Sequence, residues 1–308
     1  MATADPKEVG PAREAPRAKS GWPWVAAPVT APRPGTGFPR ITVVTPSYQQ
    51  AAYLEECLRS ILMQEYPNLE YIVMDGGSSD GSVEIIRKYE GQLAFWQSKK
   101  DGGQGDAINQ GFDRSTGDIL GWINSDDMLL PGALFAVAAA FMNSDAEIVY
   151  GDALNAFESD HSLQYWQGYW LTDSFLQFGG IISSHAIFWK RGAHVPIWSE
   201  LNCNIDGELW RRLVPGRRAL YLPLPLGVCR VHSETKSNAD VWRERWRRDA
   251  ELVQGRHGKE SRSRVFRHLF AKSQRVFKWF TWRRNIEEKR SVLEACGWGD
   301  RSWRGPRP

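Results

Sequence analysis

The sequence predicts an α/β fold in which a mostly parallel sheet is covered by helices on both faces. The first observation is that short β-branched segments alternate with segments of helical spacing between about residues 41 and 150. The second is that polar and acidic clusters follow three of the predicted strands. The third is composition: 42% of the 308 residues are hydrophobic and 24% are charged, which is typical of a globular chain long enough to bury a sizeable core.

Each element is predicted from its local pattern. Strands are indicated by short apolar runs that end at Pro, Gly or Asp, and helices by apolar residues that recur at i, i+3 and i+4. The expected strands are 41–45, 69–74, 93–96, 119–123, 147–150, 184–189, 219–222 and 227–231. The expected helices are 51–64, 82–89, 105–114, 131–143 and 206–213. An aromatic cluster expected in irregular structure is formed by Tyr165, Trp166, Tyr169 and Trp170.

The two ends of the chain differ in composition from the domain expected at residues 40–235. Residues 1–39 hold eight of the 17 prolines and little apolar periodicity, so a disordered leader is expected, with docking of Trp22 and Trp24 as the less favoured alternative. Residues 236–308 are expected to form a basic, Trp-rich helical tail. From residue 241 onward the chain carries 19 Lys/Arg against 8 Asp/Glu, whereas the preceding 240 residues have a net charge of −8.

Two roles for this tail remain open. Apolar residues recur at helical spacing between Phe266 and Phe280, with Lys and Arg in between. Such a basic amphipathic helix can lie in an anionic membrane interface, which would make residues 241–308 a peripheral membrane contact. The alternative is that the tail packs on the domain and leaves a solvated basic face. Nucleic acid is not expected as a partner, because no recognised binding motif accompanies the charge.

Cysteine usage and the N-terminus favour a cytoplasmic protein. The four cysteines are widely spaced without a CxxC pair, so neither a disulfide framework nor a zinc site is expected. No secretory signal is recognisable, and the longest apolar stretch, 129–142, is too short to span a bilayer. A location in the cytoplasm, either free or peripheral on the inner face of the membrane, is therefore predicted.

Chemistry is predicted at the carboxyl ends of the strands, where open α/β sheets bind ligands. The strand at 119–123 runs directly into Asp126 and Asp127, and paired carboxylates suit a divalent cation that also holds a diphosphate. Taken alone, this pair equally fits a turn that caps the next helix. Asp75, before two glycines, can accept hydrogen bonds from a base or ribose, or can cap its own turn.

Four motifs in this order resemble the family 2 glycosyltransferases, which have the GT-A fold, a Rossmann-like nucleotide-binding sheet. They are Thr45-Pro46-Ser47-Tyr48, the YIVMDGGSSDG segment at 71–81, the DGGQGDAINQG segment at 101–111, and Asn124-Ser125-Asp126-Asp127. The resemblance covers about residues 40 to 235. It implies transfer of a sugar from a nucleotide-diphospho-sugar to a hydroxyl of a saccharide or lipid-linked acceptor, as in polysaccharide biosynthesis, with Mn²⁺ or Mg²⁺ as the cofactor.

The resemblance also implies roles for individual residues. Donor binding is expected of Thr45, Pro46, Tyr48, Asp75, Asp101, Gln104, Asp106, Asn109, Asn124, Ser125 and Asp127. Metal binding is expected of Asp126, Asp127 and His232, with Asp126 as the main contact. The first carboxylate of a strict DxD motif is replaced here by Asn124. The catalytic base is either Asp206 or Glu208, because the segment Asn204 to Trp210 departs from the family pattern at Ile205 and Glu208.

Physical reasoning agrees with this assignment, and two rival functions remain. Glycosyl transfer needs a base for the acceptor proton and a cation for the departing diphosphate, and a single base predicts inversion at the anomeric carbon. A nucleotidyltransferase is disfavoured because residues 45–50 contain neither glycine nor a basic residue. A non-catalytic nucleotide-sugar-binding protein derived from a transferase is suggested by Asn124 and Ile205.

Overall fold

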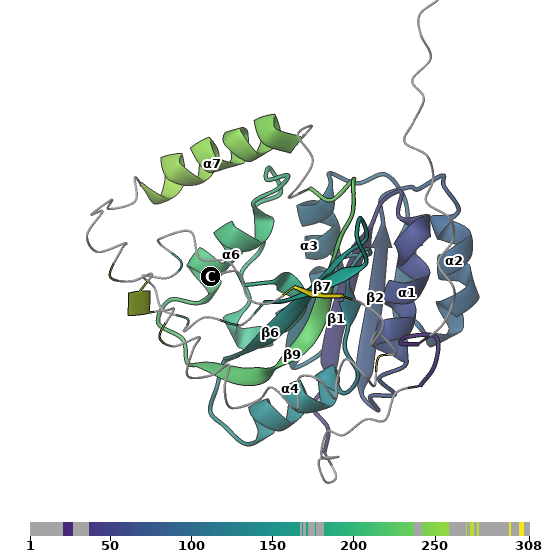
Figure 1. The fold of residues 1–308 in the computed structure, drawn as a ribbon, viewed down its shortest axis with the longest axis horizontal. Helices are drawn as coiled ribbons and strands as arrows, with labels where there is room; N and C mark the ends of the chain where they lie inside the picture. The colour runs from purple at the N-terminus through teal and green to yellow at the C-terminus, as the bar shows by residue number, and fades with distance from the viewer. Residues whose placement is uncertain are drawn as a thin grey trace, which may run out of the picture.

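The computed structural model describes residues 21–26, 37–166, 182–236 and 242–258, with positions 168, 171, 176, 269, 272, 273, 276, 296 and 302–304. Within them, one sheet carries helices on both faces (Figure 1). The strands are β1 Ile41–Ser47, β2 Leu69–Asp75, β3 Phe95–Ser98, β4 Ile119–Trp122, β5 Met128–Leu129, β6 Ile148–Phe157, β7 Ser162–Trp166, β8 Ile187–Lys190, β9 Ala219–Val231 and β10 Ser302–Arg304. The helices are α1 Ala51–Leu62, α2 Ser82–Tyr89, α3 Gln104–Arg114, α4 Ala133–Met142, α6 Ile205–Leu213 and α7 Arg243–His257. Short 3₁₀ turns are η1 Glu90–Gln92, η2 Ser184–Ala186 and η3 Arg191–Ala193.

The sheet is parallel in its first half and mixed in its second. Its order is β10-β7-β6-β8-β4-β1-β2-β3, and β4, β1, β2 and β3 all pair in parallel. The chain reverses direction across the sheet between β1 and β4, which is the switch point where such sheets bind ligands. β8 then pairs antiparallel with both β4 and β6. The predicted α/β fold with a mostly parallel sheet is therefore confirmed.

Two apolar layers hold the helices to the sheet. α1, α2 and α4 bury residues such as Leu54, Ile86 and Leu134 against one face. α3 and α6 bury Ile108 and Trp210, among others, against the opposite face. The apolar stripes of these helices thus pack on the two faces of the sheet, as the sequence predicted.

The second half differs from the sequence prediction in its strands. The two strands expected at 219–222 and 227–231 are one strand, β9, whose pairing with β6 shifts register where Pro223 and Pro225 lie. Proline lacks the N–H of a regular ladder but is tolerated at a bulge. The strand expected at 184–189 begins instead as η2 and continues as β8. Tyr165 and Trp166 lie in β7 and not in irregular structure, while Tyr169 and Trp170 lie outside the described residues.

The leader is not uniformly without structure. Trp22 is 2% exposed, its indole N–H donates to the Leu129 carbonyl at 2.8 Å, and its backbone N–H donates to the Cys296 carbonyl at 2.9 Å. Arg59 lies over the ring of Trp24 at 4.9 Å. The expectation of a disordered leader therefore fails for residues 21–26, because the two tryptophans supply apolar surface that the proline-rich composition around them lacks.

The described start of the tail packs on the domain. Within α7, Val253 is 2% exposed and Asp249 is 1% exposed. The amphipathic stretch expected from Phe266 to Phe280 lies largely outside the described residues. Within the described part of the chain, no helix has the length and apolar character needed to cross a bilayer. All four cysteines are free thiols, in agreement with the absence of a predicted disulfide framework.

Candidate active site

The loop after β4 places its two aspartates in different surroundings. Asp127 is 4% exposed, whereas the Asp126 side chain keeps 22% of its surface in solvent. The Asp127 carboxylate accepts the backbone N–H of Arg230 and the side-chain amide of Asn124, each at 3.1 Å. Asp126 is therefore the carboxylate of the pair that remains available to a ligand, and Asp127 holds the loop.

His232 lies beside Asp126 at the end of β9. Its Nε2 is 3.3 Å from Oδ2 of Asp126, and its ring lies against that of Tyr53, tilted by 30°, with centroids 4.5 Å apart. Its Nδ1 accepts the backbone N–H of Glu234 at 3.3 Å, which places the proton of a neutral ring on Nε2. In this arrangement the imidazole donates to Asp126 and orients it, while the predicted role as a metal ligand requires the other tautomer.

The residues present fit a hard divalent cation held mainly by its substrate. Among the described residues, no cluster of three or more His, Cys, Asp or Glu side chains could form an all-protein metal cage. Mg²⁺ in nucleotide enzymes is commonly held by one or two carboxylates together with phosphate oxygens and water. Asp126, backed by His232, matches this pattern, and the amide oxygen of Asn124 is already bonded to the side chain of Gln104 at 2.8 Å.

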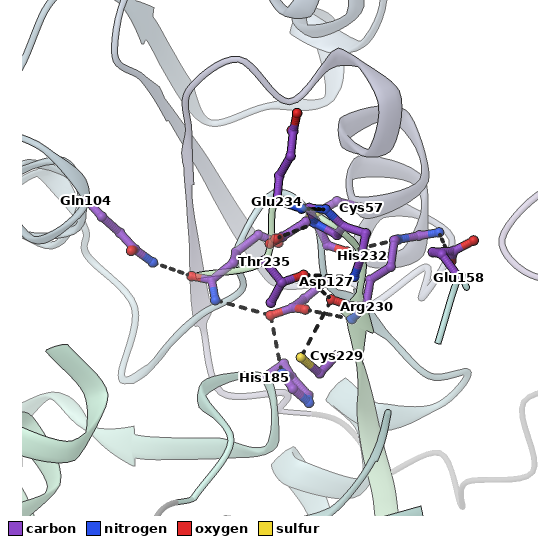
Figure 2. Close-up of polar contacts among 12 residues, drawn as sticks. Cys57, Gln104, Asp127, Glu158, His185, Cys229, Arg230, His232, Glu234 and Thr235 are labelled. Atoms are coloured by element: carbon purple, nitrogen blue, oxygen red, sulfur yellow. Dashed lines mark hydrogen bonds and ion pairs between the residues drawn. The ribbon is translucent and has the colours of Figure 1, made fainter. Parts of the chain in front are cut away.

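Arg230 holds the aspartate loop in place and was not assigned from the sequence, although it lies only two residues before His232. Its side chain is 2% exposed and pairs with Glu56 at 2.5 Å and Glu158 at 3.4 Å. Its Nε donates to the backbone carbonyl of Asp126 at 3.1 Å. Figure 2 shows Arg230 between Asp127 and Glu158. The buried guanidinium of this β9 residue thus joins Glu56 of α1, and Glu158 just after β6, to the loop.

The residues predicted to bind the donor divide into exposed and buried groups. Thr45 and Pro46 are buried within β1, so neither side chain is open to a ligand. The Thr45 hydroxyl lies 3.0 Å from that of Tyr71. Tyr48, beyond the strand, is 62% exposed. Ser125 is 5% exposed, in the aspartate loop. Of the first motif, only Tyr48 presents its side chain to a ligand.

Asp75 organises the loop that follows β2. Its carboxylate is 1% exposed and accepts the N–H groups of Gly77 and Ser78 and the hydroxyl groups of Ser78 and Ser98, at 2.6 to 3.1 Å. The turn-capping role that the sequence left open is thus present in the structure. A base bound here would meet a loop already shaped by this carboxylate.

Tyr48 and Asp101 meet over Gly76. A methyl group added at Gly76 would lie 3.1 Å from a carboxylate oxygen of Asp101 and 3.2 Å from the Tyr48 ring. Burial and the nearby carboxylates of Asp106 and Asp75 raise the pKa of Asp101. The ends of β1 and β2 and the start of α3 therefore form one continuous surface of mixed aromatic and acidic character.

The other predicted donor residues of α3 bond mainly within the protein. Asp106 accepts the N–H of Gly102 at 2.8 Å and the amide of Gln110 at 2.7 Å. Asn109 exchanges two hydrogen bonds of 2.9 Å with the backbone of Ile197. Asn109 therefore joins α3 to the segment before α6, and Gln104 is the residue of this group that reaches the aspartate loop.

Asp206 and Glu208 begin α6 but face different neighbours. Burial raises the pKa of Asp206 to about 6; the N–H of Gly207, donated at 2.8 Å, and the charge of His185 oppose this rise, while the charge of Asp127 adds to it. Glu208 is 0% exposed and pairs with Arg212 at 2.5 Å and His257 at 3.2 Å. Asp206 is therefore the carboxylate whose pKa is affected by the charge of Asp127 in the aspartate loop, whereas Glu208 holds α6 to α7.

His185 lies between these groups and was missed by the sequence analysis, in which it appeared only as part of an expected strand. It is 2% exposed, and its Nδ1 is 3.4 Å from Oδ2 of Asp127. Figure 2 places His185 beside Asp127 and Cys229. A single histidine before a strand carries no sequence signal of function, since its position next to Asp127 depends on the pairing of β8 with β4 and β6.

Comparison with known proteins agrees with this arrangement. The sequence model described as Glycosyl transferase family 2 matches residues 42–192. The glycosyltransferase GlyG of Streptococcus pneumoniae is 31% identical over 129 residues, 41% of this chain and 43% of that protein. A PGL/p-HBAD biosynthesis glycosyltransferase of Mycobacterium bovis is 31% identical over 159 residues, 50% of this chain and 60% of that protein. The chain thus spans about half the length of these curated relatives.

Two solved structures show the same fold. TarS of S. aureus, in complex with UDP-GlcNAc, aligns with a TM-score of 0.55 and 17% identity, covering 74% of this chain and 69% of that one. The mannosyltransferase PcManGT of Pyrobaculum calidifontis, in complex with GDP-Man and Mn²⁺, aligns with a TM-score of 0.50 and 21% identity, covering 71% and 64%. These likenesses confirm the GT-A fold expected from the sequence motifs.

Proposed function

Because residues 42–192 belong to glycosyl transferase family 2, we propose that the chain transfers a hexose from a nucleotide-diphospho-sugar to an acceptor hydroxyl. The observation that carries the proposal is the presence of two carboxylates in different surroundings at or near the loop after β4. Asp126 is partly exposed beside His232. Asp206 has a pKa of about 6, and the charge of Asp127, from the same loop as Asp126, contributes to this value. One carboxylate suits a cation–diphosphate group, and the other suits a proton acceptor.

Asp206 acts as the general base of this reaction. It takes the proton of the acceptor hydroxyl as the oxygen forms a bond to the anomeric carbon of the sugar. The bond from that carbon to the diphosphate breaks, and its electron pair leaves with the diphosphate. Because one base serves a single displacement, the configuration at the anomeric carbon inverts.

Asp126 would hold the cation, with Mn²⁺ or Mg²⁺ as candidates. When bound, such an ion neutralises the negative charge of the diphosphate. His232 and Arg230 keep the Asp126 side chain and its backbone carbonyl in place. The surface formed by Tyr48, Gly76 and Asp101 offers a face for the nucleoside.

The relatives support the classes of donor and acceptor. The two solved structures are complexes with UDP-GlcNAc and GDP-Man, which are both nucleotide-diphospho-hexoses. The mycobacterial relative is named for the biosynthesis of PGL/p-HBAD, which supports a biosynthetic role with a saccharide or lipid-linked acceptor. Peripheral contact of residues 241–308 with the cytoplasmic face of a membrane would bring the site close to such an acceptor.

A donor-consumption assay with Mn²⁺ tests this function against its rivals. UDP-GlcNAc and GDP-Man are incubated with the full chain, and release of nucleoside diphosphate and sugar transfer are measured. Asp126→Asn should lower turnover by at least ~100-fold, since the metal contributes several kcal/mol of charge stabilisation. Asp145→Asn, at a carboxylate that is 84% exposed and pairs with Arg218, is the matched control.

The rivals give different outcomes. A pure binding protein would bind a nucleotide-sugar and turn nothing over, and a nucleotidyltransferase would release pyrophosphate from a nucleoside triphosphate and a sugar phosphate. Transfer by Asp126→Asn at the normal rate, insensitive to EDTA, would exclude Asp126 as the metal contact.

A further inference from the structure

Lys236 places a partly buried ammonium group next to the proposed donor site. It lies beyond the end of β9, four residues after His232, and only part of its surface is exposed. Its Nζ donates to Oε1 of Gln104 at 2.6 Å and to the backbone carbonyl of Asn202 at 3.1 Å. Gln104 in turn donates to Asn124 at 2.8 Å, so a chain of hydrogen bonds leads from Lys236 to the aspartate loop.

The charge of this ammonium is not balanced by a direct partner. Both of its hydrogen-bond acceptors are neutral oxygens, and no carboxylate of the described residues lies within the 4.0 Å of an ion pair with its Nζ. Burial lowers the pKa of Lys236, and the carboxylates of Asp126 and Asp249 act on it only from a distance. A desolvated cation without an anion is costly, which favours an anionic ligand at this position.

The position of the ammonium is fixed from the α7 side. The indole N–H of Trp246 donates to the backbone carbonyl of Lys236 at 3.1 Å, and Nζ lies 5.4 Å from the ring centre of Trp242. A lysine on a flexible surface would lose considerable side-chain entropy on binding. Here much of that ordering is already present before a ligand arrives.

We propose that Lys236 is a donor-binding residue that contacts the diphosphate of the nucleotide-sugar and stabilises it as the leaving group. Three features support it. Gln104, which Lys236 bonds, is one of the residues expected to bind the donor. Asp126 of the proposed cation site influences Lys236 electrostatically, and the partly buried ammonium has no ion-pair partner among the described residues. The ammonium donates a charge-assisted hydrogen bond to a phosphate oxygen and keeps its proton. It thereby supplies positive charge at a site where Asn124 replaces one metal-binding carboxylate.

The inference rests on the proposed function and adds a second cation to it. With one carboxylate fewer in the loop, the protein would hold a metal less tightly, and a fixed ammonium would supply part of the positive charge that the diphosphate needs. Gln104 links the ammonium to the aspartate loop, because its amide oxygen accepts from Lys236 and its amide nitrogen donates to Asn124.

The test compares the binding of a nucleoside with that of its diphosphate. UDP and GDP are titrated calorimetrically into the full chain with and without Mn²⁺, alongside uridine and guanosine. Lys236→Met should weaken binding of the preferred diphosphate by ten- to a hundredfold and leave binding of the nucleoside unchanged. Lys236→Gln should do the same, and Lys236→Arg, which keeps the charge, should recover most of the affinity. Turnover should fall through kcat as well as KM, because the leaving group gains charge in the transition state.

A control variant and the pattern of binding results distinguish a failure of this inference from a failure of the proposed function. Lys88→Met is the matched control, because Lys88 is 57% exposed and pairs with Glu55 on the surface of the domain. Loss of nucleoside and diphosphate affinity in equal measure would show that Lys236 only supports the fold, and the proposal would be overturned. Equal diphosphate affinity of wild type and Lys236→Met would overturn it as well. Failure of the wild type to bind any nucleoside diphosphate would instead refute the proposed function itself.

Discussion

Nε2 of His257 lies 3.2 Å from Oε1 of Glu208, so the last turn of α7 is bonded to the first turn of the helix that carries Asp206. A second contact reinforces it: Asp249 accepts the backbone N–H groups of Asn202, Cys203 and Asn204 at 2.6 to 3.0 Å. These three residues lead into α6, and Asn204 makes no side-chain cap of its own. Asp249 therefore holds, from another helix, the turn that leads into α6.

Glu208→Gln should damage stability more than catalysis. The change removes the charge that compensates Arg212 and alters the contact with His257. Because the Arg212 side chain is 22% exposed, we expect a loss of ~2–4 kcal/mol in the free energy of unfolding. Chemical denaturation measures this loss, and transfer by the fraction that remains folded should stay within about tenfold of wild type. If transfer falls ~10²-fold or more in a variant of normal stability, Glu208 and not Asp206 is the base.

Asp206→Asn should give the opposite result. Transfer should fall ~10²–10⁴-fold through loss of the general base, while binding of donor and metal persists. The variant should also be more stable at pH 7.5, by up to ~3 kcal/mol, because the folded state raises the pKa of Asp206 from 3.8 to about 6 and so penalises its ionised form.

The stability difference has a defined pH window. Below about pH 4 the Asp206 carboxyl is protonated in both folded and unfolded states, so wild type and Asp206→Asn should unfold alike. The gap should open between about pH 4 and 6 and remain constant above. If the free energies of unfolding of wild type and Asp206→Asn differed by the same amount at all pH values, the burial of this carboxyl would be contradicted.

Activity should rise with pH for the same reason. A general base works only when deprotonated, so kcat/KM of the wild type should increase about tenfold per pH unit below about 6 and level off above it. Measurement between pH 4.5 and 8, with stability checked at each pH, tests this. A rate that stays flat through pH 5 to 7 would argue against Asp206 as the base.

Asp75→Ala should weaken binding of the nucleoside diphosphate by ~1–3 kcal/mol, the effect of a lost charge-assisted hydrogen bond or of the loop that this carboxylate shapes. Ser98→Ala serves as a comparison, because it removes one donor to Asp75 but leaves the carboxylate and its bonds to residues 77 and 78 in place. An unchanged dissociation constant in Asp75→Ala would show that Asp75 caps its turn without affecting the donor.

Local patterns predicted the first half of the domain well, because each of its elements is specified by nearby residues. α2 has the predicted bounds, and the strands that deliver Asp75 and Asp126 end within two residues of the expected positions. The choice between Asp206 and Glu208 could not be made from the sequence. Both carboxylates begin the same helix, and their difference arises from Arg212, His257 and Asp127, which tertiary packing brings together.

The second half shows the same limit. The ladder between β6 and β9 joins residues about 70 positions apart, so neither its length nor its register shifts at the two prolines is encoded locally. His185 and Lys236 acquire their surroundings from strand pairing and from α7, and neither lies in a motif that the sequence analysis used for site assignment.

Two truncations should separate the roles proposed for the tail, because α7 and the residues beyond it differ in their contacts. A chain that ends at Lys236 lacks α7, whose residues Asp249 and His257 hold the start of α6. We therefore expect it to have a lower melting temperature or to be insoluble. A chain that ends at Gly258 keeps these contacts but loses β10 and the bond from Trp22 to the Cys296 carbonyl, so it should be more stable than the shorter chain and should keep its transfer to a soluble acceptor. Residues 259–308 hold 14 Lys/Arg against 5 Asp/Glu, so if they are an interfacial anchor, only the full chain should pellet with vesicles of anionic lipid. Salt should release it, because each basic residue near the surface contributes ~1 kcal/mol that is screened within a Debye length. If the full chain and the chain ending at Gly258 bind vesicles equally, the exposed arginines of α7 carry the contact instead. If neither binds, the acceptor must be reached without this anchor.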